Sequence, residues 1–373
     1  MTDHARLTPV LARLPRSTPF IGPEELERRR GRPFRARLGA NECGFGPSPR
    51  AVAAMEAEAR EIWKYGDSTC HDLREALAAH HGVAPAQIVI GEGIDGLLGV
   101  LARLVVGPGD KVVTSLGAYP TFNFHVAGLG GDLVTVPYAA DHEDPDALIS
   151  RAAEVAAKLV YFCNPDNPMG TWHDAARVRA MVDAVPAGTL MILDEAYIDF
   201  APEGTAPDID AADDRVIRMR TFSKAYGMAG ARIGYAIGPE PLIAAFDLVR
   251  NHFGVNRVAQ AGALAALADR AHLARVTAEV AQARARIAAI GRDNSLTPMP
   301  SAASFVALDC GRDGGFARAV LEELAARDVF VRMPGAAPMD RCIRVSAGPA
   351  PELDVFAAAL PEALAAALTA RRG

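Results

Sequence analysis

The chain has few cysteines for its 373 residues, and none of them lies in a metal-binding or redox pattern. They form neither a CxxC pair nor a cluster with histidines, and their number is odd. The five are Cys43, Cys70, Cys163, Cys310 and Cys342. We therefore expect no disulfide framework and no metal site, but reduced thiols in a cytoplasmic protein.

Long apolar runs and a basic surface are also missing. The apolar stretches are broken by charge, glycine or proline well short of about 18 residues, so we expect no membrane-spanning helix. The N-terminus MTDHARLTPVLARLPR is charged throughout, so we expect no secretion signal. Lysine and arginine number 39 against 45 aspartates and glutamates, without a basic stripe, so we expect no nucleic-acid partner.

Hydrophobic residues make up 50% of the chain, which is enough for a large core. From about residue 50 to 240, short β-branched runs alternate with helical stretches, a pattern typical of a mostly parallel sheet covered by helices. We therefore expect an α/β fold with a seven-stranded sheet. The expected strands are Gln87 to Ile90, Lys111 to Thr114, Leu133 to Val136, Leu159 to Phe162, Leu190 to Leu193, Val216 to Arg220 and Gly234 to Ile237.

The pattern also predicts three parts. Residues 1–35 contain five prolines and the run ERRRGR, and we expect them to form an N-terminal arm that lies against the rest of the protein. Residues 36–255 should form the large domain, with 36–50 joining the small domain. Residues 256–373 should form this smaller α+β domain, with a helix from Gln260 to Ile290, the strand-like pieces SFVAL, VFVRM and CIRVS, and a terminal helix.

Polar loops after the expected strands are candidate ligand sites, because ligands of open α/β sheets bind beyond the carboxyl ends of the strands. In NPDNPMGTW, two prolines present Asn167 rather than bury it in regular structure. In LMILDEAYIDF, Asp194 ends an apolar strand, where an acid is costly unless it meets a cation or a hydrogen-bond donor. A helix cap is the alternative explanation for this acid.

Two further loops carry candidate chemistry. Lys224 in TFSKAYG has small, apolar and aromatic neighbours, which disfavour the charged ammonium and leave an amine nucleophile, although a solvated lysine is the alternative. The loop GEGIDG, residues 91–96, matches the dinucleotide fingerprint, but no acid ends the next strand, which argues against NAD. Its glycines and the amides of Ile94 and Asp95 could hold a phosphate at a helix N-terminus, or form a plain turn.

Taken in order, the segments GEGIDG, GAYPTF, NPDNPMG, DEAY and TFSKAYGMAGARIGY resemble the fold type I aminotransferases that use pyridoxal phosphate. Within them the chain is most similar to histidinol-phosphate aminotransferases. The resemblance runs from RLGANECGFGPSP at residue 37 to CIRVSAG at residue 342. It implies pyridoxal 5'-phosphate as cofactor, a small-molecule amino donor, a 2-oxo acid such as 2-oxoglutarate as acceptor, and a homodimer.

The resemblance also implies roles for individual residues around the cofactor. Lys224 would form the Schiff base and shuttle the proton, and Asp194 would pair with the pyridine nitrogen. Tyr197 and Asn167 would hydrogen-bond the ring oxygen, and Tyr119 would stack on the ring, although core packing also explains Tyr119. The residues that would surround the phosphate are Ile94, Asp95, Thr221, Ser223, Arg232 and, from the neighbouring subunit, Tyr65.

On the substrate side the match is looser. Arg344 would grip the substrate carboxylate and Arg332 would be a second substrate arginine. Phe20 stands where the family usually offers a tyrosine, and it cannot donate a hydrogen bond to a substrate phosphate. Cys43 and Met169 also lie at positions where the family pattern differs. Phosphate-bearing and aromatic amino donors therefore both stay open.

Three other functions are alternatives. A decarboxylase or cyclase on the same scaffold would keep Lys224 and Asp194 and cleave a different bond. A non-catalytic ligand sensor would need a DNA-binding module, for which an arm of about 35 residues leaves no room. A nicotinamide oxidoreductase would carry no covalent cofactor.

Overall fold

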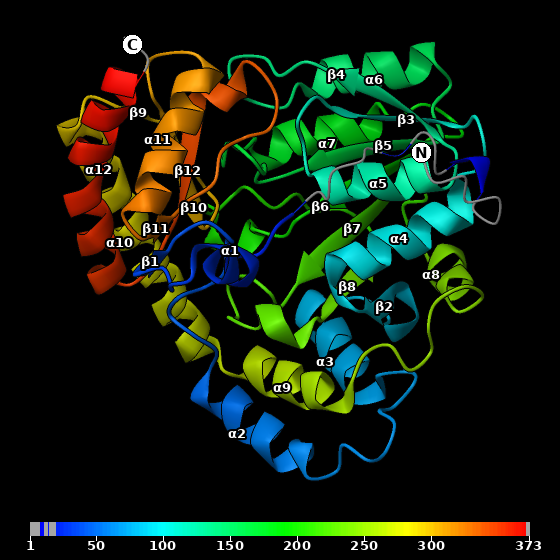
Figure 1. Ribbon diagram of the computed structural model, residues 1–373. Coiled ribbons are helices and arrows are strands. Elements are labelled where there is room, and N and C mark those ends of the chain that lie inside the picture. Colours follow the sequence, from blue (N-terminus) through cyan, green and yellow to red (C-terminus); the bar gives the residue numbers. More distant parts are fainter. Residues whose placement is uncertain (1–7, 11–13, 15–19, 371–373) are drawn as a thin grey trace.

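The computed structural model describes residues 8–10, 14 and 20–370. Its centre is a seven-stranded sheet with the order β2-β8-β7-β6-β5-β3-β4, in which only β8 runs antiparallel to its neighbours (Figure 1). The strands are β2 (Ile88–Gly91), β3 (Lys111–Ser115), β4 (Asp132–Val136), β5 (Leu159–Cys163), β6 (Leu190–Asp194), β7 (Val216–Thr221) and β8 (Gly234–Ile237). The predicted mostly parallel sheet is confirmed, and each strand lies within one residue of its expected bounds.

Helices cover both faces of this sheet, as the alternation of side chains along the strands requires. In β5, Tyr161 packs toward the layer of α4, α5 and α8, whereas Phe162 packs toward the layer of α6 and α7. A further group, α2, α3 and α9, packs at the β2 edge. These helices are α2 (Pro49–Ala59), α3 (His71–His81), α4 (Gly93–Val105), α5 (Pro120–Gly128), α6 (Pro145–Glu154), α7 (Ala175–Asp183), α8 (Glu240–Phe246) and α9 (Arg257–Ala268).

A smaller α+β unit lies at one side of the large sheet (Figure 1). Its antiparallel sheet has the order β12-β10-β9, and β1 pairs in parallel with β11. The elements are β1 (Ala36–Arg37), α10 (Arg270–Asp293), β9 (Thr297–Pro298), β10 (Phe305–Asp309), α11 (Gly314–Ala326), β11 (Val329–Phe330), β12 (Cys342–Ser346) and α12 (Ala350–Ala370).

The long helix expected from Gln260 to Ile290 is wrong, because the structure has two helices there, α9 and α10. Asp269 separates them. Its carboxylate accepts a hydrogen bond from the backbone amide of His272 and another from the hydroxyl of Ser48, so it caps α10. The break lets α9 pack on α2 and α3 while α10 packs in the small unit.

The described part of the arm lies against the small unit. Helix α1 (Pro23–Arg30) ends in Arg30, which forms an ion pair with Asp328. The ring of Phe34 packs on that of Phe330, with 5.3 Å between their centroids. Most of the expected arm before Phe20 is outside the described residues.

The expectation that every apolar stretch falls well short of about 18 residues is wrong for α12. It is the one helix in the described part of the chain that is long and apolar enough to cross a membrane. Its length and composition alone give this result, because the helix contains many alanines and few charged residues. The helix nevertheless buries one face in the core of the small unit. The buried residues are Leu353, Phe356, Ala359, Leu360, Ala363 and Ala367.

We expect Leu360→Ala to lower the free energy of unfolding of the holoenzyme by about 2 to 5 kcal/mol, because it leaves a cavity at a fully buried position. Urea unfolding followed by circular dichroism measures this change. Leu368→Ala in the last turn is the matched control, and its effect should be smaller because Leu368 is only partly buried. An unchanged unfolding midpoint for Leu360→Ala would show that α12 is not a core helix.

Candidate active site

Lys224 lies in the loop after β7, at the carboxyl end of the sheet. Its Nζ donates a hydrogen bond to the backbone carbonyl of Asn41 at 3.1 Å and lies 5.5 Å from the centre of the Tyr197 ring. Burial, together with the positive charges of Arg344 and Arg232, lowers the pKa of this amine to about 8. The structure therefore supports an amine nucleophile here rather than a solvated surface lysine.

Asp194 ends β6, which lies beside β7 in the sheet. One carboxylate oxygen accepts a hydrogen bond from the Tyr161 hydroxyl at 2.7 Å, and the other accepts one from the amide of Ala196 at 2.9 Å. Burial raises the pKa of Asp194 to about 6, and the positive charge of Lys224 opposes this rise. The buried acid has no ion-pair partner among the described residues, so it can receive a cationic group from a ligand.

The start of α4 and the loop after β7 together form an anion site. Gly93 begins the helix with a φ of 78°, and a Cβ atom there would lie 2.6 Å from the guanidinium of Arg232. Arg232 donates to the hydroxyl of Ser223 at 3.3 Å and to two backbone carbonyls, but to no carboxylate in the described part of the chain. The amide of Ser223 donates in turn to the Thr221 hydroxyl. A helix N-terminus and a cation with only neutral partners suit a phosphate.

Tyr119 and Asp95 lie beside this anion site. The Tyr119 hydroxyl donates a hydrogen bond to the Asp95 carboxylate at 2.7 Å. Burial raises the pKa of Tyr119, and the neighbouring Asp95 charge adds to this rise. The hydrogen bond fixes the aromatic ring near the N-terminus of α4, where Ile94 is buried in the core.

Asn41 is a site residue to which sequence reasoning assigned no role. Its backbone carbonyl accepts from Lys224, and its side-chain amide donates to the Tyr197 hydroxyl at 3.1 Å. Its side-chain oxygen accepts from the Ser346 hydroxyl at 3.0 Å. Asn41 adopts a φ of 55°, a conformation that asparagine tolerates better than most residues. The segment RLGANECG carries no other local signal for this position.

Two arginines of the small unit face the same site. Arg332 and Arg344 pair through their backbones, at 3.1 and 2.6 Å between amide nitrogen and carbonyl oxygen. Arg344 donates to the side-chain oxygen of Asn167 at 2.5 Å, whereas Arg332 donates to the carbonyl of Ile21 at 2.5 Å and lies 4.2 Å from the centre of the Phe20 ring. The Nε atom of each is buried without an acceptor, so both can bind an anion.

Sequence reasoning also missed a buried pair of acids beneath this loop. Asp166 accepts hydrogen bonds from the Tyr138 hydroxyl at 2.8 Å and from the amide of Met169 at 2.9 Å. Glu143 is buried beside it, and burial raises the pKa of Glu143 well above its usual value and that of Asp166 to about 6. The raised pKa values favour a protonated carboxyl beside the loop that carries Asn167. Glu143 lies in the polar run DHEDP, which indicates only a loop.

Tyr65 is the one predicted site residue that the structure leaves apart. Its side chain is 79% exposed, and its ring packs on that of Phe253 with 4.7 Å between centroids. In the part of the chain described, no other predicted site residue contacts its ring.

Sequence comparisons give relatives of known activity. The chain matches the family described as aminotransferase class I and II over residues 36–360. Histidinol-phosphate aminotransferase 1 of Mesorhizobium japonicum is 38% identical over 336 residues, which cover 88% of this chain and 90% of that protein. An aromatic amino acid aminotransferase of Mycolicibacterium paratuberculosis is 35% identical over 91% of this chain and 96% of that protein.

Solved structures agree with these relatives. The crystal structure of histidinol-phosphate aminotransferase from Sinorhizobium meliloti, in complex with pyridoxal-5'-phosphate, matches with a TM-score of 0.93 and 52% sequence identity. The match covers 98% of this chain and 99% of that one. The resemblance to fold type I enzymes is thereby confirmed, and the chain belongs to the aminotransferase class I and II family as a transaminase that uses pyridoxal phosphate.

Proposed function

We propose that this transaminase moves an amino group between an amino-alcohol phosphate of the histidinol-phosphate type and 2-oxoglutarate. The observation that carries the proposal is the pair Arg332 and Arg344, two adjacent guanidinium groups whose buried Nε atoms have no acceptor. Relatives of 34 to 38% identity bear the name histidinol-phosphate aminotransferase, which supports the same substrate class.

The residues of the site fit the cofactor. Pyridoxal phosphate, when bound, supplies a ring that withdraws electrons from the substrate α-carbon. Asp194 would hold the pyridine nitrogen protonated, because a buried carboxylate without a cation favours a positively charged neighbour. Arg232, Ser223 and Thr221, with the N-terminal amides of α4, would hold the phosphate. Tyr119 would pack against the ring.

Lys224 is the residue that would act on protons. Its lowered pKa of about 8 leaves an appreciable neutral fraction near neutral pH, so it can hold the cofactor covalently and later move the α-proton of the substrate. The Asn41 carbonyl orients its Nζ. Tyr197 and Asn167 would hydrogen-bond the hydroxyl oxygen on the cofactor ring. These bonds would set how readily the Lys224 nitrogen attached to the cofactor is protonated.

Arg344 and Arg332 would bind different anionic groups of the substrates. Arg344 would bind the α-carboxylate of the 2-oxo acid, where its bond to Asn167 fixes its orientation. Arg332 would bind the second anion, which is the phosphate of the donor in one half-reaction and the distal carboxylate of 2-oxoglutarate in the other. Phe20 packs on Arg332 without a hydrogen-bond donor, so Arg332 would supply the charge alone.

An aromatic amino donor is the second candidate. The exposed ring of Phe20 beside Arg332 offers an apolar surface on the substrate side, and an aromatic amino acid aminotransferase is 35% identical. Arg332 would then bind only the distal carboxylate of the acceptor.

The proposed enzyme is a homodimer. Residues 62–65 form an exposed patch that contains one lysine. Within it, Ile62, Trp63 and Tyr65 are 60%, 76% and 79% exposed. Exposed apolar side chains so close together are typical of an interaction surface. A second copy packed there would bring Tyr65 to the phosphate of the neighbouring site.

We expect borohydride reduction of the holoenzyme to leave a pyridoxyl group on Lys224, and Lys224→Ala to abolish amino transfer from histidinol phosphate to 2-oxoglutarate. The chain has only four lysines, so peptide mass mapping identifies the labelled one without ambiguity. Lys158→Ala, at an exposed lysine, is the control and should keep full activity. A label on Lys64, Lys111 or Lys158, or turnover by Lys224→Ala, would contradict the mechanism.

We expect Arg332→Gln to raise the KM for histidinol phosphate roughly 10- to 100-fold, because a charge-assisted hydrogen bond to the phosphate is lost. The KM for phenylalanine, which has no second anion, should change little. Steady-state assays with both donors measure this, and Arg318→Gln at an exposed position is the control. Phenylalanine as the better donor of the unaltered enzyme would favour the aromatic candidate instead.

We expect Tyr65→Ala and Lys224→Ala enzymes to complement each other when their subunits are mixed. In a mixed dimer, the Tyr65→Ala subunit keeps Lys224 and receives an intact Tyr65 from its neighbour. Random exchange should restore roughly a quarter of the activity of the unaltered enzyme. Activity assays before and after subunit exchange measure this, and the absence of any recovery would exclude a shared site.

A further inference from the structure

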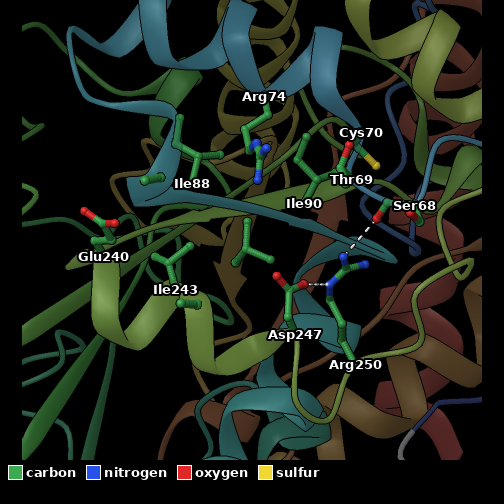
Figure 2. A pocket seen from close by; sticks show the side chains of 13 residues that line it. Ser68, Thr69, Cys70, Arg74, Ile88, Ile90, Glu240, Ile243, Asp247 and Arg250 are labelled. Atoms are coloured by element: carbon green, nitrogen blue, oxygen red, sulfur yellow. Dashed lines mark hydrogen bonds and ion pairs between the residues drawn. The ribbon is translucent and has the colours of Figure 1, made fainter.

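A cavity of about 160 Å³ lies at the β2 edge of the sheet. It is lined by α3, β2 and α8 and by the segments around residues 68 and 250, and it shares no lining residue with the active site described above (Figure 2). Its volume corresponds to about five liquid water molecules, which is room for one small organic molecule.

Arg74 reaches into this cavity from α3 (Figure 2). Its Nε atom is buried without an acceptor, and its side chain has no hydrogen-bond or ion-pair partner among the described residues. Three other described arginines have a buried nitrogen without an acceptor. Two of them are the substrate arginines Arg332 and Arg344, and the third, Arg30, is neutralised by Asp328. Arg74 therefore resembles Arg332 and Arg344, which are proposed to bind anionic groups of the substrates.

Three other charged residues line the cavity. Glu240, at the start of α8, is exposed to solvent, and Arg250 is neutralised. Arg250 forms an ion pair with Asp247 and donates to the backbone carbonyl of Ser68 at 2.9 Å (Figure 2). These bonds also join the segment of Ser68 to the end of α8. Arg74 is consequently the one lining cation without an ion-pair partner, and it can bind the anionic end of a ligand.

The floor of the cavity is apolar. Ile88 and Ile90 of β2 and Ile243 of α8 are at most 6% exposed, and their side chains line it (Figure 2). A ligand that is anionic throughout would leave these side chains in contact with charge, whereas a hydrocarbon body would bury against them. One charged end and one apolar body are therefore required.

We propose that this cavity binds a small aliphatic monocarboxylate, with the carboxylate on Arg74 and the branched hydrocarbon on Ile88, Ile90 and Ile243. Branched 2-oxo acids have this chemistry, whereas branched amino acids add an ammonium group, which the charge of Arg74 disfavours. The site is separate from Lys224, so occupation requires no chemical step and no release of the cofactor.

The first test titrates 3-methylbutanoate into the holoenzyme by isothermal calorimetry, because this probe has neither an amino nor an oxo group and cannot react. We expect Arg74→Gln to weaken binding roughly tenfold or more, since a charge-assisted hydrogen bond is lost, while amino transfer stays unchanged. Arg344→Gln should retain binding in the cavity, and the neutral 3-methylbutanamide should not bind. Binding that is lost in Arg344→Gln and kept in Arg74→Gln would overturn the proposal.

Two further arms complete the test. Ile243→Asp should abolish binding of the probe, and its far-ultraviolet circular dichroism reports whether the variant folds. Titrations of 3-methyl-2-oxobutanoate and L-valine identify which natural class binds more tightly. If no carboxylate binds, but Arg74→Gln shifts the enzyme from dimer to monomer in sedimentation, a second copy of the chain occupies the cavity and the proposal is wrong.

Discussion

The active site depends on one costly arrangement, a carboxylate buried at the end of a parallel strand with no cation of its own. Asp194 receives hydrogen bonds from Tyr161 and from the amide of Ala196, which keep it in place but do not neutralise it. Lys224 stands near it with an amine whose pKa burial lowers to about 8. The site therefore holds an acid that favours a positively charged ligand atom and an amine that is partly neutral, and a cofactor with a protonatable ring and an aldehyde meets both needs.

The arginines of this protein fall into two groups, those that form ion pairs with a carboxylate and those that do not. Arg218 and Arg220 of β7 form ion pairs with buried Glu195, and these charges lower the pKa of Glu195 to about 2. Arg232, Arg332 and Arg344 have only neutral acceptors in the described structure. Arg332 and Arg344 each have a buried Nε atom without an acceptor. Because such a buried donor is costly, it marks a place where an anion can bind. The same reasoning applies to Arg74 and the cavity at the β2 edge.

Local sequence patterns predicted the sheet well because each strand is short, apolar and bounded by loops that contain glycine, proline or charge. They failed where a single residue overrides a continuous pattern. Asp269 interrupts an alanine-rich helical stretch and caps a new helix, and the alanine content that makes α12 pack closely also gives it the composition of a membrane span. Among the site residues, Lys224 and Asp194 were predictable because each lies at or just beyond the carboxyl end of a parallel strand, at the same edge of the sheet.

The sequence by itself determined the positions of the strands along the chain, the polar loops at their carboxyl ends and the residue types that suit pyridoxal phosphate. Only the tertiary structure decided which distant groups meet. Asn41 reaches Lys224 and Tyr197, Glu143 reaches Asp166, and Arg74 is left without a partner, all through contacts between segments far apart in the chain. The physical reason is that strand periodicity is a local property, whereas the pairing of a buried polar group depends on how separate elements pack.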